Sequence, residues 1–585
     1  MCDGKPLGER NPKWLNDDYV KFIRFAQWRI DRTGEGVLGF ITNHGFLDNP
    51  TFRGMRQALM QSFHEIHILD LHGNDRKKEI DPATGLKDEN VFDIQQGVAI
   101  ILAVKKKNHT GPSKVFHKDL FGKRAEKDST ARNAAIIGGK YGWLRENTTD
   151  STKWTTVVPL TPNYYFQDVS GAVYDEYSAL SQITNILPAT VLGYQSHRDA
   201  FALSFLDNEA RDKYSKLSDP SCDDVMLAKI YDLKENRDWT IADARKLAER
   251  QPAENVIGRV AYRAFDFRHA IFSKASMDYP RTEFLSHVWN RKNLVLNTNR
   301  QTKVKDWAHA MVTDVPAGAV FLEVKDGCNA FPLYLYPVGG IPQSADPETY
   351  RVPNFSEDFL KKLAVALGTK RFLIEGYSSE LSGMILKEEL LTLPFDPVTG
   401  QYHGLPHKVS PEDIFHYIYA ILHSPSYRER YKDFLKIDFP RIPLPKGRAV
   451  FEALIPLGRK LTALHLLDAT AAPELGENRH GFPISGDNTV DEKFGAKKFP
   501  SYEQGKVSIN QLQHFKDVSP EVWSHIIGGY QPAEKWLKDR RGRTLTTDDL
   551  RHYQRMLIAI AETRSTMPAI DSVIESHGGF PGAFV

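Results

Sequence analysis

GVLGFITNHGFLDNPTFRGMRQALMQSFHEIHILDLHGN, residues 36–74, is the stretch that decides the fold of the N-terminal part. It contains two short apolar runs, at 37–42 and 65–71, and apolar residues recur at helical spacing over 51–63 between them. Short apolar runs bounded by Gly, Asn and Pro are typical of buried strands. The stretch therefore predicts a strand, a helix and a second strand.

Further elements lie on both sides of this stretch. Residues 14–30 place apolar side chains about 3.6 residues apart, which predicts an amphipathic helix that ends at Gly34. Residues 98–104 form a third apolar run, which predicts a third strand. Helix and strand thus alternate, and we expect the α/β class, as a partial Rossmann-like sheet. Because the first helix has no strand before it, we expect segments N-terminal to this sequence to complete the sheet.

The remainder of the chain has a different residue pattern. From about residue 111, short aromatic segments alternate with charged helical stretches, and after Pro411 the pattern becomes mainly helical. A chain of 585 residues is long enough for several domains. We predict three parts: residues 1–110 as a partial α/β domain, 111–340 as a mixed α+β region, and 341–585 as a mainly helical domain. The Pro- and Gly-rich residues 337–353 predict a linker or long loop.

Composition narrows the function classes. The chain has 76 Lys and Arg against 74 Asp and Glu, for a net charge of +2, so any affinity for DNA must come from local basic patches. The three cysteines, Cys2, Cys222 and Cys328, have neither disulfide-framework nor metal-ligand spacing. No apolar run approaches the ~18 residues that suggest a membrane span, and the N-terminus lacks a signal-peptide pattern. We expect a cytoplasmic protein that binds neither a membrane nor a metal.

Several long segments resemble Type ISP restriction–modification enzymes, which are single-chain proteins with nuclease, helicase, N6-adenine methyltransferase and target-recognition parts. The resemblance covers nearly the whole chain. Besides residues 36–74, it rests on NPKWLNDDYVKFIRFAQWRI (11–30), KDENVFDIQQGVAIILAVKK (87–106), YRAFDFRHAIF (262–272), LNTNRQ (296–301), FPLYLYP (331–337), SPEDIFHYIYAILHSPSYRERYKDFLKIDFPRIPLP (410–445) and GGYQPAEKWLKDRRGRTL (528–545).

The resemblance implies a function for each part. Residues 1–110 correspond to the C-terminal half of an adenine-specific methyltransferase domain, 111–340 to a target-recognition region and 341–585 to a C-terminal specificity domain. It implies double-stranded DNA as partner, S-adenosylmethionine as methyl donor, and extrusion of the target adenine from the duplex.

The family's catalytic Asn-Pro-Pro-Tyr and its glycine-rich cofactor motif do not occur in this sequence. Asn11-Pro12-Lys13-Trp14 is not that tetrapeptide, because no buried strand precedes it and Lys13 replaces the second proline. We expect an upstream polypeptide or segment to supply both motifs, together with the helicase and nuclease, and this chain alone to be inactive. A non-catalytic DNA-recognition subunit and an inactive remnant are the alternatives.

Phe92 is the predicted residue for stacking against the extruded base. In related adenine methyltransferases a Val-Phe pair before a late strand places a ring under that base, and Val91-Phe92 precedes the run 98–104 in the same manner. A core ring at the edge of the sheet is the alternative.

The segment after the first strand is expected to border the active site. Asn43 follows residues 37–42, and ligand crevices of α/β sheets open at the carboxyl ends of strands. Asp48 or Asn49 is expected to cap the next helix. His44 has no partner within reach in the sequence, and we assign it no catalytic role.

Four segments carry the side-chain types that contact bases and phosphates, namely YRAFDFR, the end of LVLNTNRQ, residues 428–441 and residues 535–543. YRAFDFR is predicted as one strand, with an internal salt-bridge set around Asp266 as the alternative to DNA contact. The run 535–543 is the densest basic run, and either phosphate contact or a solvated face accounts for it. The candidate DNA-binding residues are Arg263, Arg268, Asn299, Arg300, Gln301, Lys535, Lys538, Arg540, Arg541 and Arg543.

Overall fold

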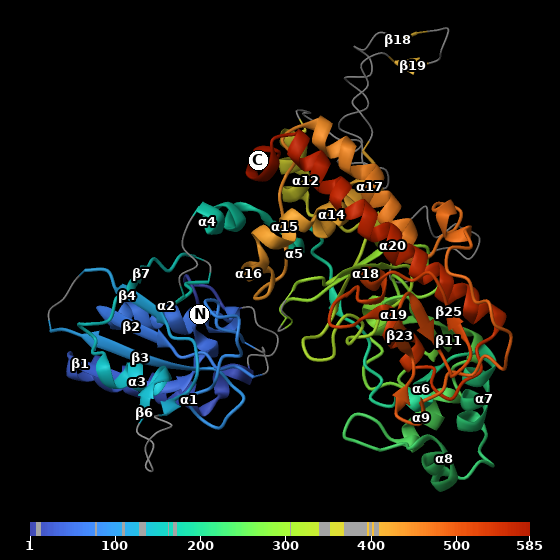
Figure 1. Cartoon of the computed structure of the whole chain (residues 1–585), viewed down its shortest axis with the longest axis horizontal. Coiled ribbons are helices and arrows are strands. Elements are labelled where there is room, and N and C mark those ends of the chain that lie inside the picture. The colour runs from blue at the N-terminus through green and yellow to red at the C-terminus, as the bar shows by residue number, and fades with distance from the viewer. Residues whose placement is uncertain are drawn as a thin grey trace. The chain divides into compact units, whose positions relative to one another are not determined.

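The computed structural model divides into two compact units (Figure 1). The N-terminal unit comprises Met1–Ala179 with Lys303–Lys305, and the C-terminal unit comprises Leu180–Thr302 with Asp306–Val585. The structure describes residues 1–7, 13–75, 79–107, 111–127, 136–161, 163–167, 172–302, 304, 306–337, 351–367, 395–396, 401–402 and 409–585.

A five-stranded sheet forms the centre of the N-terminal unit, in the order β1-β3-β2-β4-β7. The three strands predicted from the sequence are confirmed, each to within about one residue. The strand bounds are β1 Gly36–Asn43, β2 Glu65–Asp70, β3 Val98–Lys105, β4 Lys114–Asp119 and β7 Thr155–Val157.

The directions of these strands make the sheet mixed. β3 lies between β1 and β2 and runs antiparallel to both, whereas β2 and β4 are parallel. The α/β class is confirmed in this coarse sense, while the Rossmann-like arrangement stays a prediction. Alternation along the chain predicts that helices cover a sheet, but not the order of the strands. The long connection from β2 to β3 lets β3 enter between two earlier strands.

Helices cover both faces of this sheet. The buried side chains of α1 (Asp18–Thr33) and α2 (Arg53–Ser62) pack against one face, and residues of α3 (Gly139–Glu146) pack against the other. Helix α1 ends at Gly34, whose φ of 83° is left-handed and therefore suits glycine. The turn before α2 is capped by Asn49, which accepts a hydrogen bond from the Thr51 amide.

The YRAFDFR motif is a hairpin in the C-terminal unit, so its prediction as one strand is wrong. β11 (Ile257–Arg263) and β12 (Asp266–Ile271) pair antiparallel, with Arg263 opposite Asp266. Phe265 makes the turn with a φ of 62°, a conformation that few non-glycine residues adopt. No Gly, Pro or Asn marks this turn, which is why the sequence read as continuous.

The core of the C-terminal unit joins this hairpin to long helices near the end of the chain. Buried residues of β11 and of the turn after it lie in one cluster with residues of α17 (Arg448–Leu466) and α20 (Thr547–Ser576). Helix α14 (Pro411–His423) packs beside α17. No described helix is both long enough and apolar enough to cross a membrane.

The remaining elements are short. In the N-terminal unit they are η1 Lys13–Asn16, η2 His44–Phe46, η3 Pro50–Phe52, β5 Glu126–Lys127, β6 Ile136–Gly138 and α4 Ala172–Ala179. In the C-terminal unit the strands are β8 Ser181–Gln182, β9 Val191–Leu192, β10 Leu203–Ser204, β13 Val295–Thr298, β14 Ala310–Thr313, β15 Asn329–Pro332, β16 Tyr334–Leu335, β17 Val352–Pro353, β18 Phe395–Asp396, β19 Gln401–Tyr402, β20 Arg441–Ile442, β21 Lys493–Phe494, β22 Lys497–Lys498, β23 Ser501–Glu503, β24 Lys506–Ser508 and β25 His514–Phe515. Its other helices are α5 Ile183–Ile186, α6 Asp199–Ala202, α7 Asp207–Ser218, α8 Asp224–Tyr231, α9 Ile241–Ala248, α10 Ala253–Val256, α11 Thr282–Leu285, α12 Glu357–Ala366, α15 Pro425–Arg430, α16 Lys432–Leu435, η6 Pro473–Gly476, α18 Pro520–Trp523, α19 Pro532–Lys538 and α21 Gly579–Gly582.

The boundary between the compact units does not coincide with the change in residue pattern near residue 111. β4 and β7 continue the first sheet beyond residue 110, and the division falls after Ala179. The functional division at 110 and 340 stays a prediction. Most of the expected linker at 337–353 lies outside the described residues.

Candidate functional site

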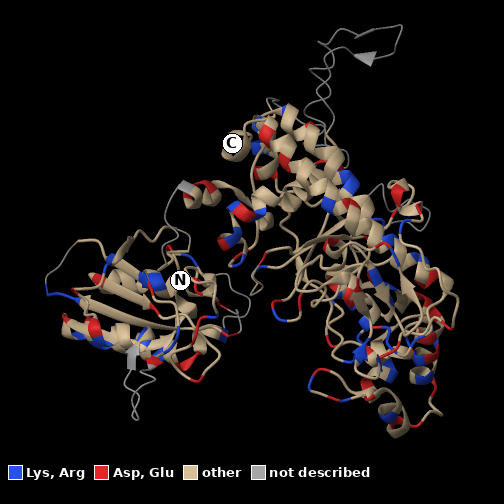
Figure 2. Ribbon diagram, viewed as in Figure 1, with Lys and Arg blue, Asp and Glu red and all other residues tan. Residues whose placement is uncertain are grey.

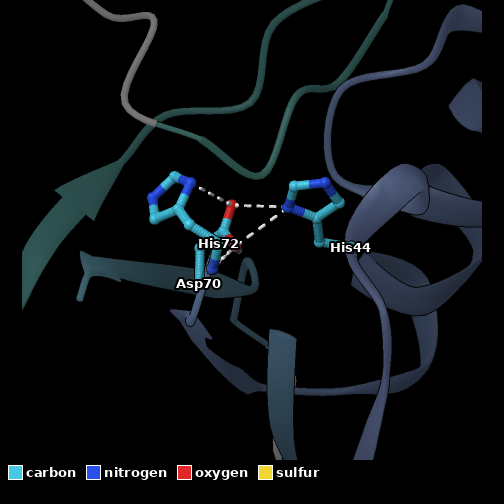
Figure 3. A group of neighbouring side chains, drawn as sticks. All are labelled: His44, Asp70 and His72. Atoms are coloured by element: carbon cyan, nitrogen blue, oxygen red, sulfur yellow. Dashed lines mark hydrogen bonds and ion pairs between the residues drawn. The ribbon is translucent and has the colours of Figure 1, made fainter. Parts of the chain in front are cut away.

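The carboxyl ends of β1 and β2 bring together side chains that are distant in the sequence. Both strands run antiparallel to β3, so their carboxyl ends lie at the same edge of the sheet. His44 follows β1, Asp70 ends β2 and His72 comes two residues later. Figure 3 shows both imidazole rings turned toward the Asp70 carboxylate.

Asp70 is fully buried and is the centre of this cluster. His44 Nδ1 lies 3.0 Å from Asp70 Oδ1, and the His72 backbone amide donates to the same oxygen at 3.0 Å. His72 Nδ1 lies 3.8 Å from Asp70 Oδ2, while its Nε2 lies 2.8 Å from Asp119 Oδ1. The two imidazoles thus share one buried carboxylate.

The pKa values of Asp70 and His72 both favour the charged forms of these two side chains. Burial opposes ionisation of Asp70, but the neighbouring His44 and His72 outweigh it and hold its pKa well below the usual range. Burial also opposes charge on His72, but Asp70, Asp119 and Glu79 outweigh it and raise the pKa of His72 to about 10. His72 is therefore a fixed positive charge at neutral pH rather than an acid–base group.

The cluster has the donor types of a metal site. His44, Asp70 and His72 each offer one ligand atom, and these atoms lie within 4.8 Å of one another. In the structure these side chains bind one another, so a metal would have to replace their mutual contacts. Asn74 Nδ2 lies 3.3 Å from His44 Nε2, which engages the other nitrogen of that ring. The geometry fits an ion-paired positioning cluster.

Asn43, the predicted border residue, ties β1 to the loop before β3. Its side chain donates to Gln96 Oε1 at 2.8 Å and accepts from the Gly45 amide at 2.8 Å. Asn90, in the same loop, donates to the carbonyl oxygens of Gly73 and Gln96. The loop that carries Phe92 is therefore attached to the carboxyl ends of both strands.

Phe92 projects from a backbone that is held in place. Its amide donates to Asn90 Oδ1 at 2.8 Å, and Arg124 donates to its carbonyl oxygen at 2.8 Å. The Phe92 side chain is 44% exposed, whereas the adjacent Val91 is 2% exposed. Val91 thus occupies the core position that was the alternative for Phe92.

A buried ion pair supports the same loop. The side chains of Lys140 and Asp88 are 0% exposed and lie 2.7 Å apart. Lys140 also donates to the Leu71 carbonyl, and Asp88 accepts from the amides of Gly73 and Gly122. This pair fixes the start of the connection that leads from β2 to Phe92.

In the C-terminal unit, Asp266 brings together two of the candidate DNA-binding residues. Arg268 Nη2 lies 2.7 Å from Asp266 Oδ2, and Arg540 Nη2 lies 2.9 Å from Asp266 Oδ1. Burial opposes charge on Asp266, but the two arginines outweigh it and lower its pKa. Arg268 thus makes the internal ion pair that was the alternative interpretation, and its contact with DNA stays a prediction.

The other members of the basic run differ in exposure. Lys535 pairs with Asp539, Lys538 with Glu534, and Arg543 contacts Glu209, while Arg541 is exposed and donates to the Phe499 carbonyl. Arg540 is only 5% exposed. Figure 2 shows basic and acidic residues interspersed along the ribbon of this unit.

The remaining candidates lie in two places. Arg263 is 9% exposed, with its guanidinium 4.2 Å from the Tyr262 ring centroid. Asn299 is fully buried, Gln301 is half-buried, and Arg300 lies 3.2 Å from Asp438.

A family model of the Type ISP C-terminal specificity domain matches residues 185–568, which is more than half of the chain. The chain belongs to this family. The resemblance found in the sequence is thereby confirmed, and the match lies within the C-terminal unit except for residues 303–305. No curated protein matches the chain.

Solved structures of two Type ISP enzymes and of a further DNA complex share the fold of this chain. An ATP-dependent Type ISP restriction-modification enzyme, LlaBIII, bound to DNA, is 19% identical with a TM-score of 0.62, over 97% of this chain and 34% of that chain. The DrdV–DNA complex is 19% identical with a TM-score of 0.61, over 95% and 52%. A nuclease-deletion mutant of the Type ISP enzyme LlaGI, in complex with a DNA substrate mimic, is 18% identical with a TM-score of 0.58, over 95% and 40%. The chain thus spans about a third to a half of these proteins.

Sequence reasoning missed the His44–Asp70–His72 cluster of this Type ISP chain. The three residues lie at the ends of two strands, and no spacing along the chain predicts that these ends are neighbours in the fold. The available signal was polar residues after two apolar runs, at the positions where α/β sheets bind ligands.

Proposed function

We propose that this chain recognises double-stranded DNA as the specificity part of a Type ISP restriction–modification enzyme. The match of residues 185–568 to the specificity-domain family is the observation that carries the proposal. The DNA complexes of LlaBIII and DrdV, which share the fold, support it. Arg541 and Lys538 are the members of the basic run best placed to reach phosphate, since Arg541 is exposed and the Lys538 side chain is 40% exposed.

Salt-dependent binding of duplex DNA tests this proposal. Replacing Lys538 and Arg541 by Gln is expected to weaken binding to every sequence and to reduce the slope of log affinity against log salt by about 0.9 per lost phosphate contact. Lys361→Gln is a matched control, because Lys361 is an exposed lysine in an i,i+4 pair like that of Lys538. A salt slope equal to the parent's would assign the run to a solvated face. Absence of duplex binding by the parent chain would end the proposal.

We further propose that the N-terminal unit contributes to N6-adenine methylation by the complete enzyme. The exposed Phe92 ring, on a loop fixed at the carboxyl ends of two strands, is suited to stack on an extruded adenine. Stacking on an aromatic ring stabilises a base by about 1–3 kcal/mol. Asn43 would act by holding the same loop.

We propose that the sheet edge of this chain does not by itself hold the methyl donor, S-adenosylmethionine. Asp70 at that edge is fully buried and already engaged by His44 and His72, so it cannot bind the ribose hydroxyls as an acidic residue does in nucleotide-binding sheets. Asp119, which ends the neighbouring strand β4, is bound through Oδ1 to His72. We propose that another segment or polypeptide holds the donor and supplies the Asn-Pro-Pro-Tyr residues.

The outer edge of the sheet is suited to such a partner. Among the described strands, β1 pairs only with β3, and its Val37 and Ile41 side chains are 66% and 42% exposed. Phe22 and Phe25 of α1 are 60% and 64% exposed. A long apolar edge strand readily pairs with another chain.

Binding of S-adenosylmethionine to the purified chain tests this division of labour. We expect weak or no binding by the chain alone, and methyl transfer only when the motif-bearing segment is present. Tight binding of the donor by this chain would contradict the proposal. If the chain binds duplex DNA but no methylation occurs with or without the motif-bearing segment, the chain is a non-catalytic recognition subunit. If neither duplex binding nor methylation is detected, the chain is an inactive remnant.

A further inference from the structure

A cavity of about 530 Å³ lies in the C-terminal unit, lined by residues of β10, α7, β12 and the segment after α19. This volume is within the range of about 300–1,000 Å³ that is typical of small-molecule pockets. The cavity wall includes two of the candidate DNA-binding residues, Arg268 and Arg543, and the aromatic rings of Phe205, Tyr231 and Tyr262.

Flat groups stack along this wall. The guanidinium carbon of Arg268 lies 3.6 Å from the Phe205 ring centroid, and that of Arg543 lies 4.0 Å from it. Arg268 also lies 4.9 Å from the Tyr262 centroid. Guanidinium planes and aromatic rings are the surfaces on which proteins stack unpaired bases.

The polar groups of the cavity have both signs. Arg543 meets Glu209 only through two 3.3 Å contacts to one oxygen, which is longer than a usual charge-assisted hydrogen bond. Asp539 Oδ2 and Ser204 Oγ are buried atoms with no hydrogen-bond partner in the described part of the chain. Ser204 is only 5% exposed. Buried polar atoms without partners are rare, and a bound ligand is one explanation.

We propose that this pocket binds an unpaired nucleobase of the guanine type. Guanine offers acceptors at O6 and N7, which arginine recognises. It also offers donors at N1 and N2, from one of which Asp539 Oδ2 can accept a hydrogen bond while Asp539 Oδ1 stays paired with Lys535. A bare phosphate would account for Arg543 but not for the carboxylates of Glu209 and Asp539 or for the aromatic wall. The base comes either from DNA or from a free nucleotide, and it is distinct from the adenine assigned to Phe92. The inference goes beyond duplex recognition.

Ser204→Ala is the sharpest variant for this pocket. Because the Ser204 hydroxyl has no protein partner in the described part of the chain, its removal leaves the folded protein's own hydrogen bonds intact. A loss of binding then reports the ligand rather than the fold. Arg543→Gln removes the donor group. Arg211→Gln is the control, since Arg211 lies on α7, the helix that carries the lining residue Glu209, but pairs with Asp207 and does not line the cavity.

Calorimetric titration of the full chain with guanosine monophosphate tests the proposal. We expect saturable binding that Ser204→Ala weakens about fivefold and Arg543→Gln about tenfold or more, with Arg211→Gln unchanged. Guanosine should bind as well, and inorganic phosphate should not. A duplex with one bulged guanine is the second probe: tighter binding than to the paired duplex assigns the base to DNA, and equal binding assigns it to a free nucleotide.

Two results would overturn the proposal. One is that guanosine monophosphate shows no saturable binding and the bulged duplex binds no more tightly than the paired duplex. The other is that inorganic phosphate binds as well as guanosine monophosphate. Loss of paired-duplex binding with retained guanosine binding would instead count only against the proposed DNA-specificity function.

Discussion

Unfolding of the N-terminal unit should depend on pH through His72. Its pKa rises from 6.5 to about 10 in the folded protein, so its contribution to stability is fully present below pH 6.5 and is lost as the pH rises through 10. For one proton with these two pKa values, the contribution is about 4 kcal/mol at pH 7 and about 1 kcal/mol at pH 9. The expected loss over this interval is therefore roughly 2–3 kcal/mol.

The comparison with His72→Gln isolates this contribution from other groups that titrate. Urea unfolding at pH 7, 8 and 9, with the N-terminal unit followed by pulse proteolysis, gives the free energy of unfolding of parent and variant. The stability gap between them should shrink by roughly 2–3 kcal/mol from pH 7 to pH 9. A gap that stays constant, or a His72 proton that titrates near pH 6.5 by NMR in the folded chain, would refute the assignment of a fixed charge at this position.

Three further substitutions have distinct expected results. Phe92→Ala should lower methylation by the complete enzyme without changing its unfolding midpoint, because the ring is 44% exposed; unchanged methylation kinetics would remove Phe92 from the site. Arg540→Gln should destabilise the C-terminal unit by about 3–5 kcal/mol in denaturant unfolding, since it removes one partner of the buried Asp266, and a change below 1 kcal/mol would contradict a buried ion pair. Gly97→Ala should destabilise the N-terminal unit by about 1–3 kcal/mol, because its new methyl group would overlap the His44 ring; an unchanged midpoint would show that the ring can move.

The sequence was most informative where structure is local. The apolar runs gave β1, β2 and β3 to within about a residue, and Gly34 marked the end of α1, since these features depend on neighbouring residues alone. The direction of β3 could not be predicted from the sequence, because it depends on pairing across the long connection that follows β2.

The candidate site was less accessible for the same reason. Phe92 could be singled out from its place before a strand, but the cluster around Asp70 requires that two strand ends meet. The ion pair between Asp266 and Arg540 joins residues 274 positions apart, so no pattern in either segment predicts it. Charge runs alone likewise gave no means of separating the buried Arg540 from its exposed neighbour Arg541.

The ion pair between Asp266 and Arg540 also determines when the β11–β12 hairpin can complete its folding during translation. Asp266 leaves the ribosome 274 residues before Arg540, which corresponds to a delay of roughly 14–55 s at about 5–20 residues per second. During this time the β11–β12 hairpin lacks its second cation and the late helices that enclose it. Nascent chains stalled before residue 540 should therefore keep this hairpin sensitive to proteases and open to chaperones until translation is nearly finished.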